Sequence, residues 1–353
     1  MMRHIIPQLP IMPLQRVSPS RFTAMKLCSL QEVWASKCDP LLPIFPEARL
    51  GSVIHKMLEL SAKGLMDIEQ FDDHWMVQIE KVEMKIAQIW QEEQFVPLST
   101  SVKNYYVKRA LCYKVANNIL RKMLYSRQRS GRVNPELRVN SPDGYITGII
   151  DLIRKDNDGV QIVDYKTGLY MSTDRTVKQE YQDQLKMYAA LYFTQCGIWA
   201  NRLTIIGLNQ VELDIPFTPS ECIDVLNSAK QLIDSINAKI HAGCTQESLA
   251  NPTPESCKHC CFRPACALYW LYRDNTMIWP TDIRGKIIHQ QLLGNGLAKV
   301  IVQDRLSEMS VRRLSPARHT FLNEDINQVI LCNLKREKSL NSFVESQFTT
   351  GFI

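Results

Sequence analysis

The chain has 353 residues, of which 45% are hydrophobic and 22% are charged, so it is long enough to bury one large core or two modest ones. No stretch has the uninterrupted apolar length that a membrane span needs, and the proline-broken start lacks the apolar block of a signal peptide. We therefore expect a cytoplasmic protein with no membrane partner, and the formal charge of +6 favours a polyanionic partner without requiring one.

Helices are predicted throughout the first third of the chain after a proline-rich lead. Apolar residues recur at helical spacing over residues 20–36, 47–63, 68–94 and 101–132, and Cys28 falls on the apolar face of the first helix, so we expect it to point inward. The last helix has almost no acid, and its basic stripe predicts either phosphate contact or a solvated face. The stripe consists of Lys103, Lys108, Arg109, Lys114, Arg121, Lys122, Arg127, Arg129 and Arg132.

A mixed pattern of strands and helices begins near residue 135. The turn sequences Ser-Pro-Asp-Gly and Asp-Asn-Asp-Gly separate the first three strands, which predicts an antiparallel meander. The predicted elements are strands at residues 136–140, 145–154 and 160–166, a helix at 176–195, strands at 202–208 and 211–215, and a helix at 219–242. This order indicates an α/β domain.

The last part of the chain, residues 280–353, is strand-like again. Gly, Asn, Ser and Pro join four predicted strands at residues 285–303, 310–318, 328–334 and 342–353. We expect a small all-β module here, with an OB-like barrel as its form and single-stranded DNA binding, partner docking or simple packing as its role.

Two acids and a lysine stand at the ends of neighbouring predicted strands. Asp151 closes one strand, and Asp164 and Lys166 share a face of the next because strand side chains alternate. Two close, partly buried carboxylates repel each other, and a divalent cation such as Mg²⁺ or Mn²⁺ relieves that strain. The ammonium could activate water or stabilise charge on a phosphate. An Asp-x-Lys triplet alone is also typical of a surface ion pair.

Three polar residues on predicted helices could complete such a site. His55 follows Gly51 by four residues, and an imidazole ligand would tilt the metal preference towards manganese, although a lone helical histidine is usually structural. Gln184 and Tyr188 lie four residues apart and so share a helix face. From that face they could meet a nucleic-acid backbone or the lysine, and the plain alternative is an amphipathic helix.

Eleven cysteines are present, and four of them fall between residues 257 and 266. Cys257, Cys260 and Cys266 supply three thiols in one polar loop, with Cys261 beside them, and the absence of an export signal favours metal ligation over disulfides. A fourth ligand must come from elsewhere in the chain, and zinc and a [4Fe–4S] cluster both fit the spacing. The remote candidates are Cys28, Cys38 and Cys244.

Taken together, these motifs resemble the RecB-like iron–sulfur branch of the PD-(D/E)XK nucleases, over residues 18–275. That group includes the CRISPR-associated RecB-like exonucleases and the nuclease domain of AddB. The resemblance rests on the chain order of Cys28, residues 51–55, Glu136, residues 148–151, residues 164–166, residues 184–188 and the cysteine triplet. It implies a restriction-endonuclease-like core with helical N-terminal insertions.

The resemblance also implies roles for individual residues. His55, Asp151 and Asp164 would be metal ligands together with the Tyr165 carbonyl, and Lys166 would be the catalytic lysine. Gln184 and Tyr188 would support substrate and site, and Glu136 is a secondary candidate. A structural [4Fe–4S] cluster would be bound by Cys28, Cys257, Cys260 and Cys266. The chain departs from the family at Ser29, where proline commonly follows the first cysteine, and at Cys261, which has no counterpart.

The function implied is that of a DNA exonuclease favouring single-stranded ends, in DNA repair, CRISPR adaptation or antiviral defence. Residues 1–17 would be an extension, residues 18–275 the nuclease and residues 280–353 an accessory module. A second interpretation is a non-catalytic DNA-binding or scaffold subunit, but the catalytic residues are intact. No Gly-rich ATP-binding loop with its lysine is present, so unwinding would require a separate helicase.

Overall fold

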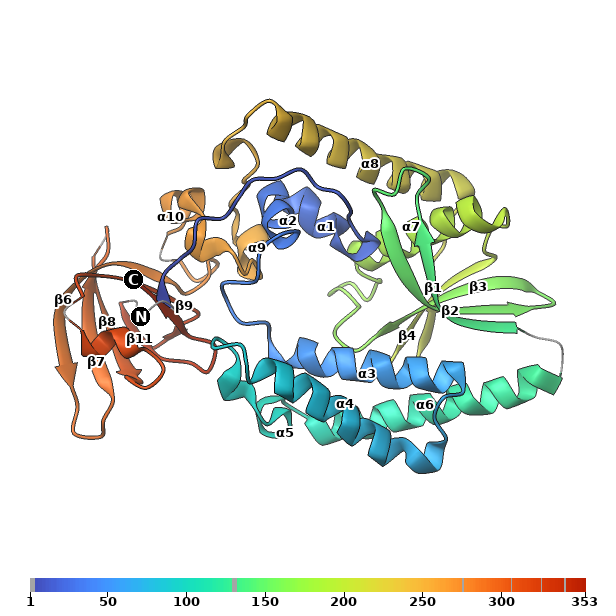
Figure 1. Cartoon of the computed structure of the whole chain (residues 1–353), viewed down its shortest axis with the longest axis horizontal. Helices are drawn as coiled ribbons and strands as arrows, with labels where there is room; N and C mark the ends of the chain where they lie inside the picture. The colour runs from blue at the N-terminus through green and yellow to red at the C-terminus, as the bar shows by residue number, and fades with distance from the viewer. Residues whose placement is uncertain (1–3, 129–131, 275, 306, 325, 340) are drawn as a thin grey trace.

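Figure 1 shows the computed structural model of the chain, in which residues 4–128, 132–274, 276–305, 307–324, 326–339 and 341–353 are described, without the side chains of residues 123–135 and 156. Its first sheet has five strands in the order β1-β2-β3-β4-β5. They are β1 (Arg132–Asn140), β2 (Thr147–Asp156), β3 (Gly159–Lys166), β4 (Arg202–Gly207) and β5 (Glu212–Asp214). The predicted order of three strands, a helix and two strands is confirmed.

The crossover between β3 and β4 sets the geometry of this sheet. β1, β2 and β3 pair antiparallel, as β4 and β5 do, whereas β3 and β4 run parallel. A parallel pair needs a long connection, and α7 (Gln179–Cys196) supplies it, followed after β5 by α8 (Pro219–His241). Helix α8 begins with a capping box in which Thr218 and Glu221 bond each other's backbone amides.

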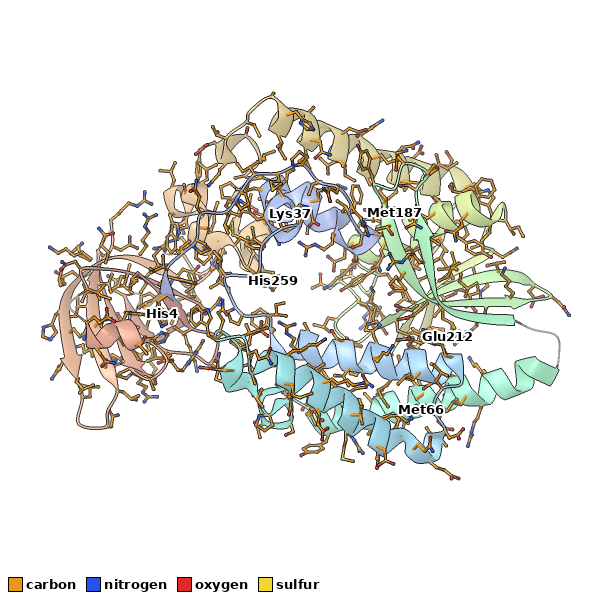
Figure 2. All side chains as sticks on the ribbon, in the orientation of Figure 1. His4, Lys37, Met66, Met187, Glu212 and His259 are labelled. Atoms are coloured by element: carbon orange, nitrogen blue, oxygen red, sulfur yellow. The ribbon has the colours of Figure 1, made fainter. Side chains whose placement is uncertain are left out.

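Helices cover both faces of the five-stranded sheet. One face packs on α3 (Pro46–Lys63), α4 (Phe71–Ile86), α5 (Leu98–Ser101) and α6 (Tyr105–Gln128), and the other packs on α7 and α8. Strand alternation sends neighbouring residues of β3 to opposite cores, Val163 towards α3 and Ile162 towards α7. In Figure 2, Met66 marks the first layer and Met187 the second. None of the described helices is long and apolar enough to cross a membrane.

The helix predicted over residues 20–36 is interrupted, which corrects the sequence prediction. A 3₁₀ turn leads into α1 (Phe22–Leu27), and α2 (Ser29–Ala35) follows after Cys28, whose backbone is extended at φ −156° and ψ 105°. The break costs little because residues 249–251 satisfy its polar groups. The Leu27 carbonyl accepts from Asn251 Nδ2 at 2.9 Å, and the Leu30 N–H donates to the Leu249 carbonyl at 3.1 Å. Cys28 is half-buried at the break and packs against the core, so the prediction that it points inward is confirmed although the helix is interrupted.

The C-terminal segment forms a seven-stranded sheet, so its β-rich character is confirmed. Its order is β10-β11-β8-β7-β6-β9-β12, with β11 and β8 the parallel pair. The single strand predicted over residues 285–303 is wrong, because the Gly-Asn-Gly turn at 294–296 splits it in two. An OB-fold is a barrel of five strands, whereas this sheet has seven, so the predicted OB-like form stays a prediction. The strands are β6 (Ile283–Leu292), β7 (Ala298–Gln303), β8 (Glu308–Leu314), β9 (Gln328–Cys332), β10 (Lys335–Arg336), β11 (Ser342–Val344) and β12 (Thr350–Phe352).

A buried polar network joins this second sheet to the cysteine-rich loop, which contains α9 (Pro254–Lys258) and α10 (Ala267–Tyr272). Asp282 accepts from Arg263 Nε at 2.6 Å, from Tyr269 Oη at 2.8 Å and from the Asn333 N–H at 2.8 Å. Burial alone would raise the pKa of Asp282, but the charge and hydrogen bonds of Arg263 hold it below its usual value. Asp282 is therefore an ionised group on which both segments depend.

Replacing Asp282 by alanine is expected to lower the free energy of unfolding by about 3–5 kcal/mol, because the Arg263 guanidinium is left buried without a counter-charge. Urea unfolding followed by circular dichroism would measure the change. The matched control is Glu337→Ala, which removes the carboxylate of the exposed pair with Arg312 and should leave stability unchanged. Equal stability of the two variants would contradict a structural role for Asp282.

Candidate active site

The two strand-end acids come together because β2 and β3 are neighbours. The last paired rung of these strands is Leu152 with Val163, which places Asp151 next to Asp164. Asp164 is buried, with 4% of its surface exposed, and Asp151 is half-buried. The Tyr165 N–H donates to Asp151 Oδ2 at 2.9 Å, which holds that carboxylate at the end of β3. The structure thus places the pair side by side, one carboxylate deeper than the other.

Lys166 and Gln184 close a ring of contacts on Asp164. Lys166 Nζ lies 2.7 Å from Asp164 Oδ2 and donates to Gln184 Oε1 at 2.9 Å, while Gln184 Nε2 donates to Asp164 Oδ1 at 3.0 Å. Strand β3 presents Asp164 and Lys166 and α7 presents Gln184, so three predicted site residues from two elements meet. The amide fixes the position of both the ammonium and the carboxylate.

His55 reaches this group from α3. Its Nδ1 lies 3.5 Å from Asp151 Oδ2. Burial lowers the pKa of His55, but the hydrogen bond and charge of Asp151, with the charge of Asp164, outweigh burial and leave the pKa raised. Gly51, one turn earlier, lets α3 lie close to the end of β3, because a Cβ there would be 3.0 Å from Thr167 Oγ1.

The electrostatics of Asp164 suit a cation. The pKa of Asp164 is raised to about 6, because burial and the like charge of Asp151 raise it by more than the nearby Lys166 lowers it. Its Oδ2 is buried without a hydrogen-bond partner, although it is ion-paired with Lys166. Hard carboxylate oxygens of this kind are what Mg²⁺ and Mn²⁺ prefer, and His55 adds a nitrogen. These donors fit a divalent ion by their chemistry.

Tyr188 and Tyr165 occupy different surroundings. The Tyr188 hydroxyl accepts from Gln184 Nε2 at 3.4 Å, and Gly148 of β2 makes room for its ring, since a Cβ there would be 2.6 Å from Tyr188 Cε1. Tyr165 sends its side chain to the opposite face, into the core under α3. Its side chain therefore takes no part in the site, and the predicted ligand role of its carbonyl stays a prediction.

Tyr181 is a neighbour of the lysine that the sequence did not reveal. Its ring centre lies 4.3 Å from Lys166 Nζ, and burial raises the pKa of its hydroxyl to about 12. The available signal was its position three residues before Gln184, on the same face of α7. Glu136, the secondary candidate, instead pairs with Lys63 of α3 at 3.1 Å. Among the described contacts none joins Glu136 to the acids of the site.

The predicted basic stripe divides between solvated and paired side chains. Lys103, Lys114 and Arg121 are exposed, whereas Arg109 pairs with Asp72 and Lys122 pairs with Glu212 at 3.1 Å. Arg129 lies outside the described residues, as do the side chains of residues 127 and 132. Within the described part, the exposed side chains fit either a solvated face or phosphate contact, so both interpretations stay predictions.

Four cysteines line one small cavity. Cys28 enters it from the break between α1 and α2, and Cys257, Cys260 and Cys266 enter it from the loop around α9, with about 300 Å³ of empty space, part of it open to solvent. Apolar Leu30, Trp34 and Ala250 complete much of the lining, which also contains Gln31, Pro252, Ser256, Arg263 and Tyr269. Cys38, Cys244 and Cys261 are not part of it. The structure therefore groups the four cysteines that the resemblance selected.

Neither the cavity cysteines nor the acids are arranged as the ligands of a preformed metal site. Burial raises the pKa of Cys260, and it raises that of Cys266 to about 11, so a bound cation would be needed to keep these groups as thiolates. Within the part of the chain that the structure describes, no three His, Cys, Asp or Glu side chains are already arranged around a metal position. At the acids, Lys166 occupies the position beside Asp164 Oδ2.

A comparison with protein families places the chain. A family model described as the PD-(D/E)XK nuclease superfamily matches residues 16–267, which is more than half of the chain. The matched range spans His55, both acids, Lys166 and the four cysteines that line the cavity. No curated protein matches the chain.

Proposed function

Because the chain belongs to the PD-(D/E)XK nuclease superfamily, we propose that it is a metal-dependent DNA exonuclease favouring single-stranded ends. The observation that carries the proposal is the convergence of Asp164, Lys166 and Gln184, with Asp151 and His55 beside them. These residues come from α3, β2, β3 and α7, and together they bring two acids, an ammonium and an imidazole to one place. A non-catalytic scaffold would not need them together.

The acids and the histidine would hold the divalent ion. His55, Asp151 and Asp164 would be its side-chain ligands, and the Tyr165 carbonyl would be a further one. Members of the superfamily typically use Mg²⁺ or Mn²⁺, which supplies Lewis-acid polarisation of the phosphate and lowers the pKa of bound water. The imidazole favours Mn²⁺ over Mg²⁺.

Lys166 would act on the reacting phosphodiester directly. Its ammonium, held by Gln184 and lying over the Tyr181 ring, is fixed near the acids and can stabilise the negative charge that grows on the phosphate. Because Gln184 also holds Asp164, the ammonium and the carboxylate keep a constant spacing. The Tyr188 hydroxyl accepts a hydrogen bond from the Gln184 amide and so helps to hold it in place.

We also propose that the chain is a member of the RecB-like branch, with a [4Fe–4S] cluster bound by Cys28, Cys257, Cys260 and Cys266. The shared cavity supports this assignment, and the cluster would be structural, because phosphodiester hydrolysis needs no redox step. Zinc is the alternative occupant. The cluster would hold α1 and α2 against the loop of α9, so that residues 18–275 form one nuclease unit, with residues 280–353 as an accessory module and a separate helicase supplying any unwound DNA.

The metal and end requirements can be tested together. We expect linear single-stranded DNA to be degraded with Mg²⁺ and faster with Mn²⁺, and to survive in EDTA, because without a divalent ion the carboxylates repel the phosphate and no metal-bound water is available to attack it. Circular single-stranded DNA of equal length should survive in every buffer. Gel analysis of end-labelled and circular substrates makes the measurement.

Each failure has its own meaning. Cleavage of the circle would replace the exonuclease assignment by an endonuclease. Absence of cleavage of both substrates with either metal would favour the alternative, a non-catalytic DNA-binding subunit of a helicase–nuclease complex.

A further inference from the structure

An open pocket lies between α10 and the seven-stranded sheet. It encloses about 1080 Å³ of empty space, part of it open to solvent, and is bounded by α10, β6, β7, β9 and the turn after β7. In Figure 1, α10 and β6 lie towards the end of the molecule opposite the five-stranded sheet that carries the acids. The lining residues with polar side chains are Arg273, Arg284, Lys286, Gln303, Asp304, Arg305 and Gln328. The pocket is thus separate from the candidate active site.

The lining carries four cations and a single acid. Asp304 is buried and already compensated, because it pairs with buried Arg273 at 2.5 Å and accepts from the Arg305 N–H at 2.7 Å. Arg284, Lys286 and Arg305 are exposed, and within the described residues none of the three is paired with a carboxylate. Three positive charges therefore face one pocket without internal neutralisation. Such a concentration of charge attracts an anion.

The register of the sheet arranges these groups in rows. Lys286 of β6 lies opposite Gln303 of β7 on one side and Gln328 of β9 on the other, so two amides flank the ammonium. Arg284, two residues before Lys286, shares its face of the strand, and its guanidinium lies 6.0 Å from the centre of the Trp270 ring. Arg284 and Lys286 stand on the same strand, β6, which fixes the spacing of these two cations.

We propose that this pocket binds the phosphodiester backbone of single-stranded DNA. The inference rests on the proposed nuclease function and gives that nuclease a second, non-catalytic contact with its substrate strand. Lys286 and Arg284 would contact phosphates, and Gln303 and Gln328 would bond phosphate or base oxygens and nitrogens. Leu271 of α10, with 58% of its surface accessible, lines the pocket and offers an apolar surface against which a base can pack.

An acidic polypeptide is the competing occupant, and the lining favours DNA over it. Carboxylates would use the cations alone, whereas the flanking amides and the exposed Leu271 match the bases that accompany every phosphate of a strand. Surfaces that bind single-stranded DNA usually combine positive charges, which contact the phosphates, with groups against which the bases pack.

The test measures binding separately from cleavage. Full-length Arg284→Gln/Lys286→Gln is compared with Lys335→Gln/Lys338→Gln, which removes the same charge from exposed positions of the same module outside the pocket. Fluorescence anisotropy with a labelled single-stranded oligonucleotide in EDTA is recorded across a salt series. The pocket variant should bind roughly tenfold more weakly, and its slope of log affinity against log salt should be shallower by about 1.4, the value for two lost phosphate contacts. Hydrolysis of a trinucleotide, too short to reach both sites, should be unchanged.

The outcomes test the proposed DNA-binding pocket and the proposed nuclease function separately. Equal affinity and equal salt slope for the two double variants would overturn the pocket, whatever the cleavage assay shows. Competition by poly-glutamate as effective as by DNA of equal charge would also overturn it, in favour of an acidic protein. Pocket-dependent DNA binding by a wild-type protein that cleaves nothing would uphold the pocket and reject the proposed nuclease function.

Discussion

Lys166→Ala should lower the rate of DNA hydrolysis by about 10²- to 10⁴-fold while leaving the protein folded and able to bind DNA. The ammonium is the one described cation in direct contact with Asp164, and Gln184 holds it in place, so its charge is preorganised for the phosphate. A preorganised charge acts mainly on the transition state, and the loss is expected in kcat rather than in KM. Single-turnover cleavage of end-labelled DNA would measure it.

The control for this prediction is Lys239→Ala, on α8, which removes a lysine from a helix that does not contribute to the site. A second comparison is Gln184→Ala, which keeps the ammonium but frees its position, so a smaller loss than that of Lys166→Ala is expected. Cleavage at the wild-type rate by Lys166→Ala would refute the assignment of the active site. A loss shared equally by Lys239→Ala would indicate a general effect on folding.

The sheet and the acids could be predicted because their signals are local. Turn sequences mark the ends of the first three strands, and once β2 and β3 are neighbours, Asp151 and Asp164 must approach each other. The alternation of a strand then places Lys166 beside Asp164. Gln184 could be anticipated only as a polar position on a helix, since its hydrogen bonds depend on how α7 crosses the sheet.

The break at Cys28 could not be predicted, because its cause lies more than two hundred residues away. The sequence of residues 20–36 has a continuous helical pattern, and only the polar groups of residues 249–251 make an interruption stable. The network around Asp282 is hidden for a similar reason, since Asn333 lies more than fifty residues after Asp282 in sequence and Arg263 and Tyr269 lie before it. Tertiary contacts override local propensity at both places.

This interruption also explains how the cysteine cavity is assembled. A continuous helix would carry Cys28 on a regular face, whereas the extended residue between α1 and α2 directs it to the cavity shared with the loop of α9. The same segment, residues 249–251, that satisfies the break leads directly into that loop. The sulfur positions and the backbone break are therefore parts of one arrangement.

Cys28→Ser is expected to lower the melting temperature by more than about 10 °C and to abolish iron binding. Cys28 is the one cavity cysteine from the N-terminal part of the chain, so its loss opens a loop of more than two hundred residues. In the chain-entropy description, closing a loop of that order contributes about 5 kcal/mol, and each kcal/mol shifts the melting temperature of a chain this large by roughly 2–4 °C. Calorimetry and iron and sulfide analysis of anaerobically purified protein would make the measurement.

Three other cysteines provide the matched controls, since Cys38→Ser, Cys244→Ser and Cys261→Ser remove thiols that do not line the cavity. These variants should keep the iron content and the broad absorbance near ~400 nm that thiolate-bound iron–sulfur centres give. A colourless wild-type protein loaded with zinc would contradict the iron–sulfur cluster. It would keep the cross-link between Cys28 and the loop of α9, because a tetrahedral zinc site uses the same four thiolates. Unchanged stability in Cys28→Ser would contradict any stabilising cross-link through Cys28. The break between α1 and α2 would then be held by the hydrogen bonds of residues 249–251 alone.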